Sequence, residues 1–227
     1  MRGVLIAFEG IEGSGKSTQA KLLFSFLKEK SLKCILSYEP GGTKIGDRIR
    51  DILLDVENKN MHRKTELLLY LASRAQHVYE KIMPELQKGT IIITDRFSLS
   101  SMAYQGMGRE LSFKVVSRLN KFAAGNVKPD LTILVDVPVS VGLNRIELRS
   151  KGDVRLRRTS QQRSGENIDR LEKEKTEFHQ RIRDGYLNLA KRAPKKILVF
   201  NGTKPENALF EEIKEKVLAF LKKRGTL

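Results

Sequence analysis

The residues whose types and spacing point most directly to chemistry lie between Glu9 and Thr18, in the stretch EGIEGSGKST. Within it, residues 10–17 fit the pattern G-x-x-x-x-G-K-[ST] of a phosphate-binding P-loop. Glycines let such a loop curl so that several backbone N–H groups point at one anion. Lys16 can then reach the β- and γ-phosphates of a nucleotide, and the Ser17 hydroxyl can bind Mg²⁺. The expected ATP-binding residues are Gly10, Ile11, Glu12, Gly13, Ser14, Gly15, Lys16, Ser17 and Thr18.

The sequence on either side of the loop favours this interpretation over the alternative, a glycine-rich turn that binds nothing. Residues 4–8 form a short apolar run, as a buried strand does. Residues 16–28 place Ala20, Leu23 and Leu27 at the spacing of one helix face. A strand that enters the loop and a helix that leaves it are the context in which the motif holds phosphate.

Apolar runs alternate with helical patterns along the whole chain, which is typical of an α/β fold. The runs expected to form strands are residues 4–8, 34–38, 90–94, 131–137 and 196–200. This alternation predicts a five-stranded parallel sheet with helices on both faces, in a single domain over residues 1–227. Right-handed crossovers bring the carboxyl ends of all strands to one edge, so functional residues are expected just after the strands.

The third expected strand ends in a carboxylate followed by a guanidinium, Asp95 and Arg96. A carboxylate at the end of a strand beside a P-loop can hold Mg²⁺ directly or through water. An adjacent arginine can bridge phosphates with two hydrogen bonds. The alternative is a structural ion pair, and the presence of a P-loop favours the functional interpretation. We therefore expect Ser17 and Asp95 to bind the metal.

An aromatic ring and a guanidinium, Tyr70 and Arg74, lie one turn apart within a helical stretch that starts at Glu66. This stretch is apolar nearly all round, so we expect it to be largely buried. Residues spaced i,i+4 share a helix face, which could bind a base. By spacing alone, a core aromatic beside a surface ion pair is the commoner explanation. Upstream, the turn at 39–43 reads EPGGT, and its Thr43 is expected to cap the next helix.

A basic segment from Arg149 to Arg163 follows the fourth strand and its helix. Its cations are Arg149, Lys151, Arg155, Arg157, Arg158 and Arg163, against the single acid Asp153. A solvated or disordered loop is one interpretation. The other is a lid over about residues 149–165 that brings arginines over ATP when both substrates are bound. A long polar helix is expected at 166–191.

Composition limits the classes of protein to consider. No apolar run approaches the ~20 residues that cross a bilayer, and we expect no membrane partner. Cys34 is the only cysteine, in an apolar run where a buried thiol is expected. No signal peptide is evident before the first strand, which favours the cytoplasm. The three histidines, His62, His77 and His179, show no metal-ligand spacing.

The net charge of +16 raises nucleic acid as a partner. A protein that handles several phosphates also needs positive fields, and surface lysines supply the rest. The sequence contains no helix-turn-helix, zinc-finger or RNP signature, and aromatics make up only 7% of the residues. We therefore do not expect nucleic acid to be the main partner.

Three stretches taken together resemble the thymidylate kinases of the bacterial type: FEGIEGSGKSTQ, EPGGT, and DRF-SLSS-x-AYQ. The resemblance covers essentially the whole chain and implies the P-loop nucleoside monophosphate kinase fold. Members of that family transfer the γ-phosphoryl group of ATP to dTMP with Mg²⁺, making dTDP for dTTP synthesis. The acceptor is already an ionised phosphate, so positioning and charge neutralisation suffice and no general base is needed.

The resemblance also implies roles for single residues. Glu12 matches an acid near the 3′-hydroxyl side of dTMP, and Arg50 matches an arginine on the monophosphate. Tyr70 matches the aromatic that stacks on thymine, Arg74 matches the arginine that orients the base, and Arg96 matches the arginine at the phosphate junction. The implied dTMP-binding set is Glu12, Arg50, Tyr70, Arg74, Arg96, Ser101, Tyr104 and Gln105. Tyr104 is expected to crowd the ribose 2′ position and so favour deoxyribose.

This chain has no arginine at residues 11–14 of the P-loop, where some relatives place a catalytic one. Relatives that lack it use the lid instead. The expected catalytic residues are Lys16, Asp95 and Arg96, with Arg149, Arg155 and Arg157 as lid candidates. The basic segment is longer than the resemblance leads us to expect. The resemblance further implies a homodimer.

Two other functions stay open at this point. One is a kinase for a different nucleotide or nucleoside, because only the resemblance ties Tyr70, Arg74 and Tyr104 to a pyrimidine deoxynucleotide. The other is an ATP-dependent nucleic-acid protein, which the positive charge suggests. It predicts salt-sensitive affinity for DNA or RNA and ATP hydrolysis that nucleic acid stimulates.

Overall fold

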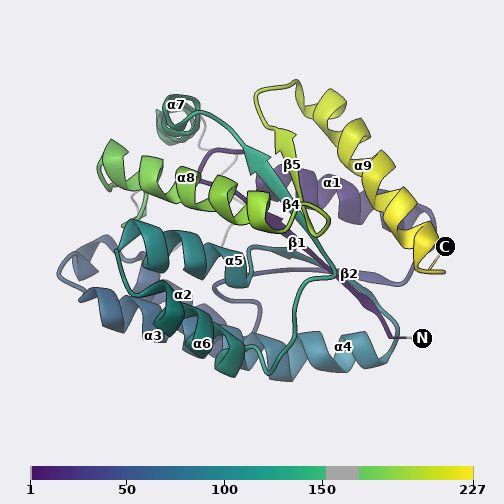
Figure 1. Ribbon diagram of the computed structural model, residues 1–227, viewed down its shortest axis with the longest axis horizontal. Helices are drawn as coiled ribbons and strands as arrows, with labels where there is room; N and C mark the ends of the chain where they lie inside the picture. Colours follow the sequence, from purple (N-terminus) through teal and green to yellow (C-terminus); the bar gives the residue numbers. More distant parts are fainter. Residues whose placement is uncertain (1, 152–168, 227) are drawn as a thin grey trace.

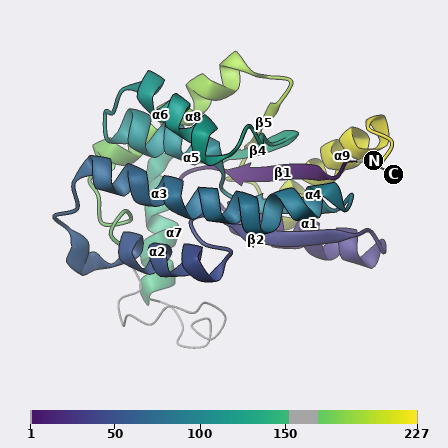
Figure 2. The same ribbon diagram turned by 90° about the horizontal axis from the view of Figure 1, so that it is seen from below.

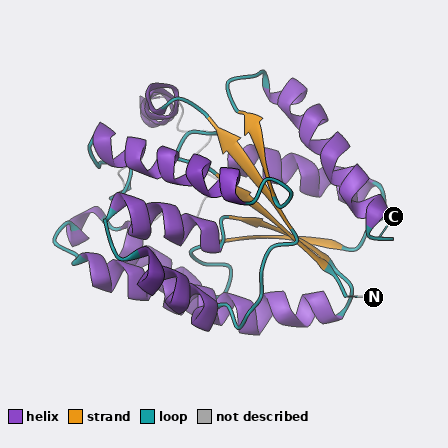
Figure 3. Cartoon of the chain, viewed as in Figure 1, coloured by secondary structure: helices purple, strands orange, loops and turns teal. Residues whose placement is uncertain are grey.

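The computed structural model describes residues 2–151 and 169–226. Strands and helices alternate through these residues, and the strands gather into one central sheet (Figures 1 and 3). The strands are β1 (Val4–Glu9), β2 (Cys34–Tyr38), β3 (Ile91–Asp95), β4 (Leu131–Asp136) and β5 (Ile197–Asn201). Each lies within one or two residues of its predicted bounds, so the prediction of the five strands is confirmed.

All neighbouring strands are parallel, in the order β2-β3-β1-β4-β5. Phe8 of β1 and Tyr38 of β2 both pair with Asp95 of β3, so these three strands end level with one another. Their carboxyl ends form one edge of the sheet. The chain segments that follow β1 and β3 start side by side there, because β1 pairs with β3.

The two faces of the sheet are buried by different helices, as the predicted fold requires. Val4, Ile6 and Phe8 point to one face and pack with α1 (Lys16–Glu29) and α9 (Glu206–Lys223). The intervening Leu5 and Ala7 point to the other face and pack with the π-helical segment η2 (Val78–Ile82) and α4 (Met83–Gln87). The period of two in a strand therefore places Glu9 on the second face.

The second face also carries α5 (Ser98–Ser101), the π-helical segment η3 (Met102–Gly108) and α8 (Thr176–Arg192). The remaining α-helices of the described residues are α2 (Lys44–Leu54), α3 (Arg63–His77), α6 (Phe113–Ala123) and α7 (Val139–Lys151), and η1 (Val56–Asn58) is a short 3₁₀ helix. α3 contacts both α2 and α6, and the three run together on one side of the molecule (Figures 1 and 2).

Two expectations about single elements need correction. The helix expected at 166–191 begins only at Thr176, because residues 170–173 form turns that precede it. α3 is less buried than its apolar sequence suggests: Leu68 is 58% exposed, since one side of the helix faces away from the core. Three other expectations hold, because Thr43 accepts a hydrogen bond from Gly46 N and caps α2, Cys34 is buried, and α9 packs on the sheet.

Most of the predicted lid, from residue 152 to 165, lies outside the described residues. Among the helices that the structure describes, none has the length and apolar character needed to cross a bilayer.

Candidate active site

The P-loop connects the end of β1 to the start of α1, as predicted. Gly13 has φ +69°, and a Cβ there would lie 2.2 Å from the carbonyl oxygen of Gly142 in α7, so only glycine fits. Gly15 is the N-cap of α1 and offers no side chain to the first turn. The free N–H groups of that turn, with the helix dipole, suit the binding of an anion.

Lys16 is 7% exposed and donates a hydrogen bond from Nζ to the carbonyl of Ile11 over 3.2 Å. Burial lowers its pKa, and the nearby guanidinium of Arg96 lowers it further, while Asp95, Glu12 and Glu9 act in the opposite direction. A cation held in this way gains from an arriving phosphate. The side chains of Ser17 and Thr18 are exposed beside it.

The turn after β3 brings Asp95 and Arg96 to the same edge of the sheet. Arg96 has φ +72°, an uncommon conformation for a residue with a side chain, and its N–H bonds to the carbonyl of Phe8 over 2.8 Å. Asp95 and Arg96 form no ion pair with each other in the described part of the chain. Asp95 Oδ1 is buried, and no described residue bonds to it.

This donor set fits Mg²⁺, which prefers oxygen ligands. An unpartnered buried carboxylate oxygen at Asp95 and an exposed hydroxyl at Ser17 are ligands of that kind. Among the described residues, no group of three or more His, Cys, Asp or Glu side chains could hold a metal alone. Phosphate oxygens would therefore have to complete the metal's ligands.

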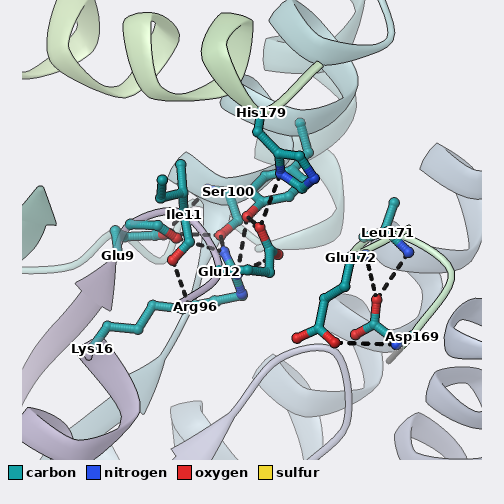
Figure 4. A network of polar contacts seen from close by, with 12 residues as sticks. Glu9, Ile11, Glu12, Lys16, Arg96, Ser100, Asp169, Leu171, Glu172 and His179 are labelled. Atoms are coloured by element: carbon teal, nitrogen blue, oxygen red, sulfur yellow. Dashed lines mark hydrogen bonds and ion pairs between the residues drawn. The ribbon is translucent and has the colours of Figure 1, made fainter. Parts of the chain in front are cut away.

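Arg96 lies at the centre of a polar cluster with Glu12 and Tyr104, and Figure 4 shows Arg96 beside Glu12. Its Nη2 donates to Glu12 Oε1 over 2.8 Å and to the Tyr104 hydroxyl over 3.0 Å. The Tyr104 hydroxyl also lies 2.6 Å from each oxygen of the Glu12 carboxylate. Burial acts to raise the pKa of Glu12, but Arg96 and Lys16 outweigh it and lower that pKa. Glu12 is therefore an anion that shares Arg96 with any incoming phosphate.

A second buried carboxylate, Glu9, supports this cluster from behind, and the sequence analysis assigned it no role. It is fully buried and accepts hydrogen bonds from Phe97 N (2.9 Å), Ser100 Oγ (2.6 Å) and the Tyr186 hydroxyl (2.9 Å). Burial raises its pKa, against these hydrogen bonds and the charge of Arg96. Glu9 thereby fixes the turn that carries Arg96. Its position at the end of β1 was the signal that could have identified it.

Two more residues, both from the carboxyl-terminal part of the chain, interact electrostatically with Glu12. His179 of α8 is 1% exposed, its Nδ1 is 3.8 Å from Glu12 Oε2, and no described residue bonds to its Nε2. Asp169, in the turn before α8, has a pKa raised to about 6 by burial and by the charges of Glu172 and Glu12. Figure 4 shows His179 beside Glu12, and Asp169 further away in a group with Leu171 and Glu172. Neither was predicted, because nothing in local spacing relates them to the P-loop.

Arg74 and Ser101 meet in a separate buried region. Arg74 is 2% exposed and donates from Nε to Glu39 Oε2 over 2.8 Å, and from Nη1 to Ser101 Oγ over 2.8 Å. The alternative prediction for Arg74, an ion pair at the surface, is therefore wrong in one respect: Arg74 does form an ion pair, but the pair is buried. Tyr70, one turn earlier, is half-buried, and burial raises the pKa of its hydroxyl.

The other predicted residues are more scattered. Arg50 donates from Nη1 to the carbonyl of Pro40 over 2.9 Å, in the EPGGT turn. Gln105 donates to Glu66 Oε1 over 3.0 Å, and Arg149 pairs with Glu172 at 2.6 Å on the outside of the molecule. The lid candidates Arg155 and Arg157 lie outside the described residues.

Arg145 of α7 is a further residue that the sequence analysis passed over. It donates to the carbonyl of Gly13 over 3.2 Å and to that of Gly202 over 3.0 Å. It therefore ties the P-loop to the turn after β5, on the side away from Arg96. This contact joins residues 132 positions apart, which no local pattern indicates.

A five-stranded parallel sheet whose first strand sends a P-loop into a helix is the architecture of P-loop nucleotide-binding proteins, and the chain is of that class. The family described as thymidylate kinase matches residues 8–213. That match spans most of the chain, so the chain belongs to the thymidylate kinase family.

Individual relatives agree over nearly the whole length. The chain is 45% identical to the thymidylate kinase of Kosmotoga olearia over 98% of its own length and 99% of the relative's. It is 47% identical to the thymidylate kinase of Geotalea daltonii, over 88% of its own length and 89% of the relative's. The crystal structure of thymidylate kinase from Ehrlichia chaffeensis aligns with a TM-score of 0.72 at 29% identity, covering 96% of this chain and 99% of that one.

Proposed function

We propose that this chain phosphorylates dTMP to dTDP with ATP as the phosphoryl donor. The observation that carries the proposal is membership of the thymidylate kinase family over nearly the whole chain. A P-loop and an arginine at the adjacent strand end supply positive charge of the kind that phosphoryl transfer between two nucleotides needs. The product would serve dTTP synthesis.

The chemistry of the site is positioning and neutralisation of charge. The dTMP phosphate is ionised at neutral pH, so no side chain has to remove a proton from the acceptor. Lys16 of the P-loop and Arg96, which bonds to the carbonyl of Gly10 in that loop, supply the positive charge. Glu12 and Tyr104 hold the Arg96 guanidinium before substrate arrives, which lowers the reorganisation that the reaction needs. Arg149, Arg155 and Arg157 remain candidates for further positive charge.

Mg²⁺ would be held by Asp95 and the Ser17 hydroxyl together with phosphate oxygens. When bound, it neutralises charge on the β- and γ-phosphates and orients them for in-line attack. The buried, unpartnered Oδ1 of Asp95 supports this assignment.

On the acceptor side, we assign the base to Tyr70 and Arg74, and the monophosphate to Arg50 and Arg96. Glu12 and Tyr104 are assigned to the sugar, where the buried Tyr104 ring would crowd a 2′-hydroxyl. Ser101 and Gln105 act through neighbours, because Ser101 bonds to Arg74 and Gln105 bonds to Glu66.

We further propose a homodimer formed through α2, α3 and α6, and a location in the cytoplasm. Each of these three adjoining helices leaves large apolar side chains in water. The most exposed are Phe122 (84%), Leu68 (58%), Ile45 (52%) and Val115 (50%). Apolar surface of this kind on neighbouring helices suits a second copy of the chain. The single cysteine supports the cytoplasmic location.

The test is ADP release with Mg-ATP against a panel of acceptors: dTMP, dUMP, UMP, dCMP, AMP, GMP, thymidine and single-stranded DNA. We expect turnover confined to dTMP, with dUMP weaker. The Tyr104→Ala variant, run on dTMP and its ribose counterpart, tests discrimination between the sugars.

Turnover with a different monophosphate would overturn the substrate and leave the phosphoryl-transfer site in place. ADP release that rises with DNA alone would instead support an ATP-dependent nucleic-acid protein. Unchanged selection against ribose in Tyr104→Ala would contradict the assignment of Tyr104 to the sugar.

A further inference from the structure

Four buried side chains form a continuous hydrogen-bonded chain that includes Glu39, the first residue of the EPGGT turn. Ser37 Oγ lies 2.7 Å from His77 Nε2, and His77 Nδ1 lies 3.0 Å from Glu39 Oε1. The other carboxylate oxygen, Glu39 Oε2, accepts from Arg74 Nε over 2.8 Å. None of the four is more than 4% exposed. Of these residues only Arg74 has a role in the proposed function.

The charge of Glu39 decides the direction of the hydrogen bonds. Burial acts to raise its pKa, but the charge of Arg74 and the hydrogen bond from His77 outweigh burial and lower it. Glu39 is therefore a carboxylate, which can only accept. His77 must donate from Nδ1, and its Nε2 is left to face the Ser37 hydroxyl. One histidine thus connects the end of β2 to the carboxylate that holds Arg74.

The same contacts fix the guanidinium of Arg74. Its Nη1 donates to Ser101 Oγ and to Asn120 Oδ1, and its Nη2 donates to the carbonyl of Phe97 over 3.1 Å. With the Nε bond to Glu39, four of its five N–H groups have partners. One N–H on Nη2 is left over in the described part of the chain. A group that can only donate selects an acceptor atom.

The order serine, histidine, carboxylate also occurs in hydrolases, but here the serine is not a nucleophile. Ser37 is 2% exposed, and the turn closes over it. Gly42 has φ +81°, and a Cβ there would lie 2.7 Å from Ser37 Oγ and 3.1 Å from the His77 ring. No substrate carbonyl could approach this hydroxyl. The chain of bonds is consequently a structural support whose one functional end is Arg74.

We propose that His77 and Ser37 are positioning residues for recognition of the acceptor base. They hold Glu39, and through it Arg74, in one orientation, so that the remaining Nη2 N–H points toward a carbonyl oxygen of the base. A base with an amino group at that place would present a donor to a donor and be rejected. This inference rests on the proposed contact between Arg74 and the base.

The test compares two amide substitutions of His77. In His77→Asn the amide nitrogen takes the place of Nδ1 and can still donate to Glu39. In His77→Gln the amide takes the place of Nε2, so Glu39 Oε1 loses its donor. We expect His77→Gln to raise KM for dTMP about tenfold and to lower the preference for dTMP over dCMP about as much, since a misaligned buried donor loses most of its discrimination.

The same assays separate positioning from a general loss of structure. KM for ATP should stay within about twofold of the wild type in both variants, and His77→Asn should keep KM for dTMP within about threefold. Ser37→Ala, which removes only the far end of the chain, should raise KM for dTMP about threefold with KM for ATP unchanged. It serves as the second variant if His77→Gln fails to fold, as judged by circular dichroism.

The inference is overturned if all three variants keep the wild-type KM for dTMP and the wild-type base preference, whatever happens to their melting temperatures. It is also overturned if His77→Asn and His77→Gln lose acceptor binding equally. Failure of the proposed function is visible separately, because the wild type would then not phosphorylate dTMP. The His77 comparison would in that case be run with whichever monophosphate the wild type uses, and it decides the inference on the same terms.

Discussion

Lys16 carries its positive charge in a place where water scarcely reaches it. Burial and Arg96 lower its pKa, so at neutral pH the charged form costs folding free energy relative to the unfolded chain. The same charge is what the site offers to a γ-phosphate. Stability and function therefore oppose each other at this residue, as is common in active sites.

We predict that Lys16→Met loses activity and gains stability. kcat should fall about 10²- to 10³-fold or more, the size of effect seen when a charge-stabilising group is removed. Without nucleotide, the variant should melt above the wild type at pH 7. That gain should shrink as the pH rises toward 10.5, where the wild-type lysine loses its proton in the unfolded chain too. Steady-state kinetics measure the fall in kcat, and thermal melts at pH 7 and pH 10 measure the gain in stability. A variant that turns over like the wild type would contradict the role of Lys16.

Among individual residues, the sequence predicted those that the chemistry requires and missed those that support them. Lys16, Asp95 and Arg96 follow from a motif and a strand end, and the structure brings them to one edge of the sheet. Glu9 and Tyr186 join across 177 residues, and such a bond has no local pattern. The same holds for His77. Its partner is a carboxylate 38 positions away, and no local pattern indicates that contact.

The turn that precedes α8 is a small element held by reciprocal caps. Asp169 Oδ1 accepts from the N–H groups of Leu171 and Glu172, each over 2.9 Å, and Glu172 Oε2 accepts from Asp169 N over 3.1 Å. This is the arrangement of a capping box. Here it closes the turn of residues 170–173, and the helix predicted from residue 166 starts later, at Thr176.

We predict that Asp169→Asn stabilises the protein at neutral pH. The folded-state pKa of Asp169 is raised from 3.8 to about 6, so its favourable contribution is present below pH 3.8 and is lost as the pH rises through 6. Asparagine keeps the accepting oxygen without the charge. At pH 7.5 the gain should be about 1 to 2 kcal/mol, allowing for the solvent that reaches this side chain.

Urea unfolding of both proteins at pH 4.5 and pH 7.5 measures this difference. The gain should be smaller at the lower pH. Asp55→Asn is the matched control, because the exposed Asp55 accepts from Glu57 N in a similar cap. An equal gain for Asp169→Asn at both pH values would contradict the account.

The strands were predictable because each one contains a mostly apolar run, and in the central strands β1, β3 and β4 this run is buried on both faces. The extent to which a helix is buried was not, since α3 has the same apolar residues on its packed side and on its open side. Leu71 is 6% exposed and Leu68 58%, although the two are three residues apart. Which side of a helix meets the core depends on its neighbours in space.

At the scale of the whole molecule, the open side of α3 belongs to the surface proposed for the dimer. We predict that the wild type sediments as a dimer and that Phe122→Asp sediments as a monomer at the same concentration. A buried carboxylate in an apolar interface lacks a partner and costs several kcal/mol. Phe122 is 84% exposed in the single chain, so the fold itself should be unaffected.

Analytical ultracentrifugation over a range of concentrations gives the association constant. Leu148→Asp is the control, because Leu148 is 60% exposed on α7 and does not belong to the proposed interface. It should dimerise like the wild type. A wild type that remains monomeric at all concentrations would contradict the homodimer.

The bond between Glu9 and Tyr186 also sets an order of events during synthesis. Ribosomes add about 5 to 20 residues per second, so Tyr186 is made roughly 10 to 35 s after the carboxylate that it covers. During that interval the first strand and the P-loop are already outside or leaving the ribosome, with Glu9 still in water. The nascent chain therefore has its phosphate-binding motif long before it has the support that aims Arg96. A polypeptide that stops short of α8 carries the motif without a finished site.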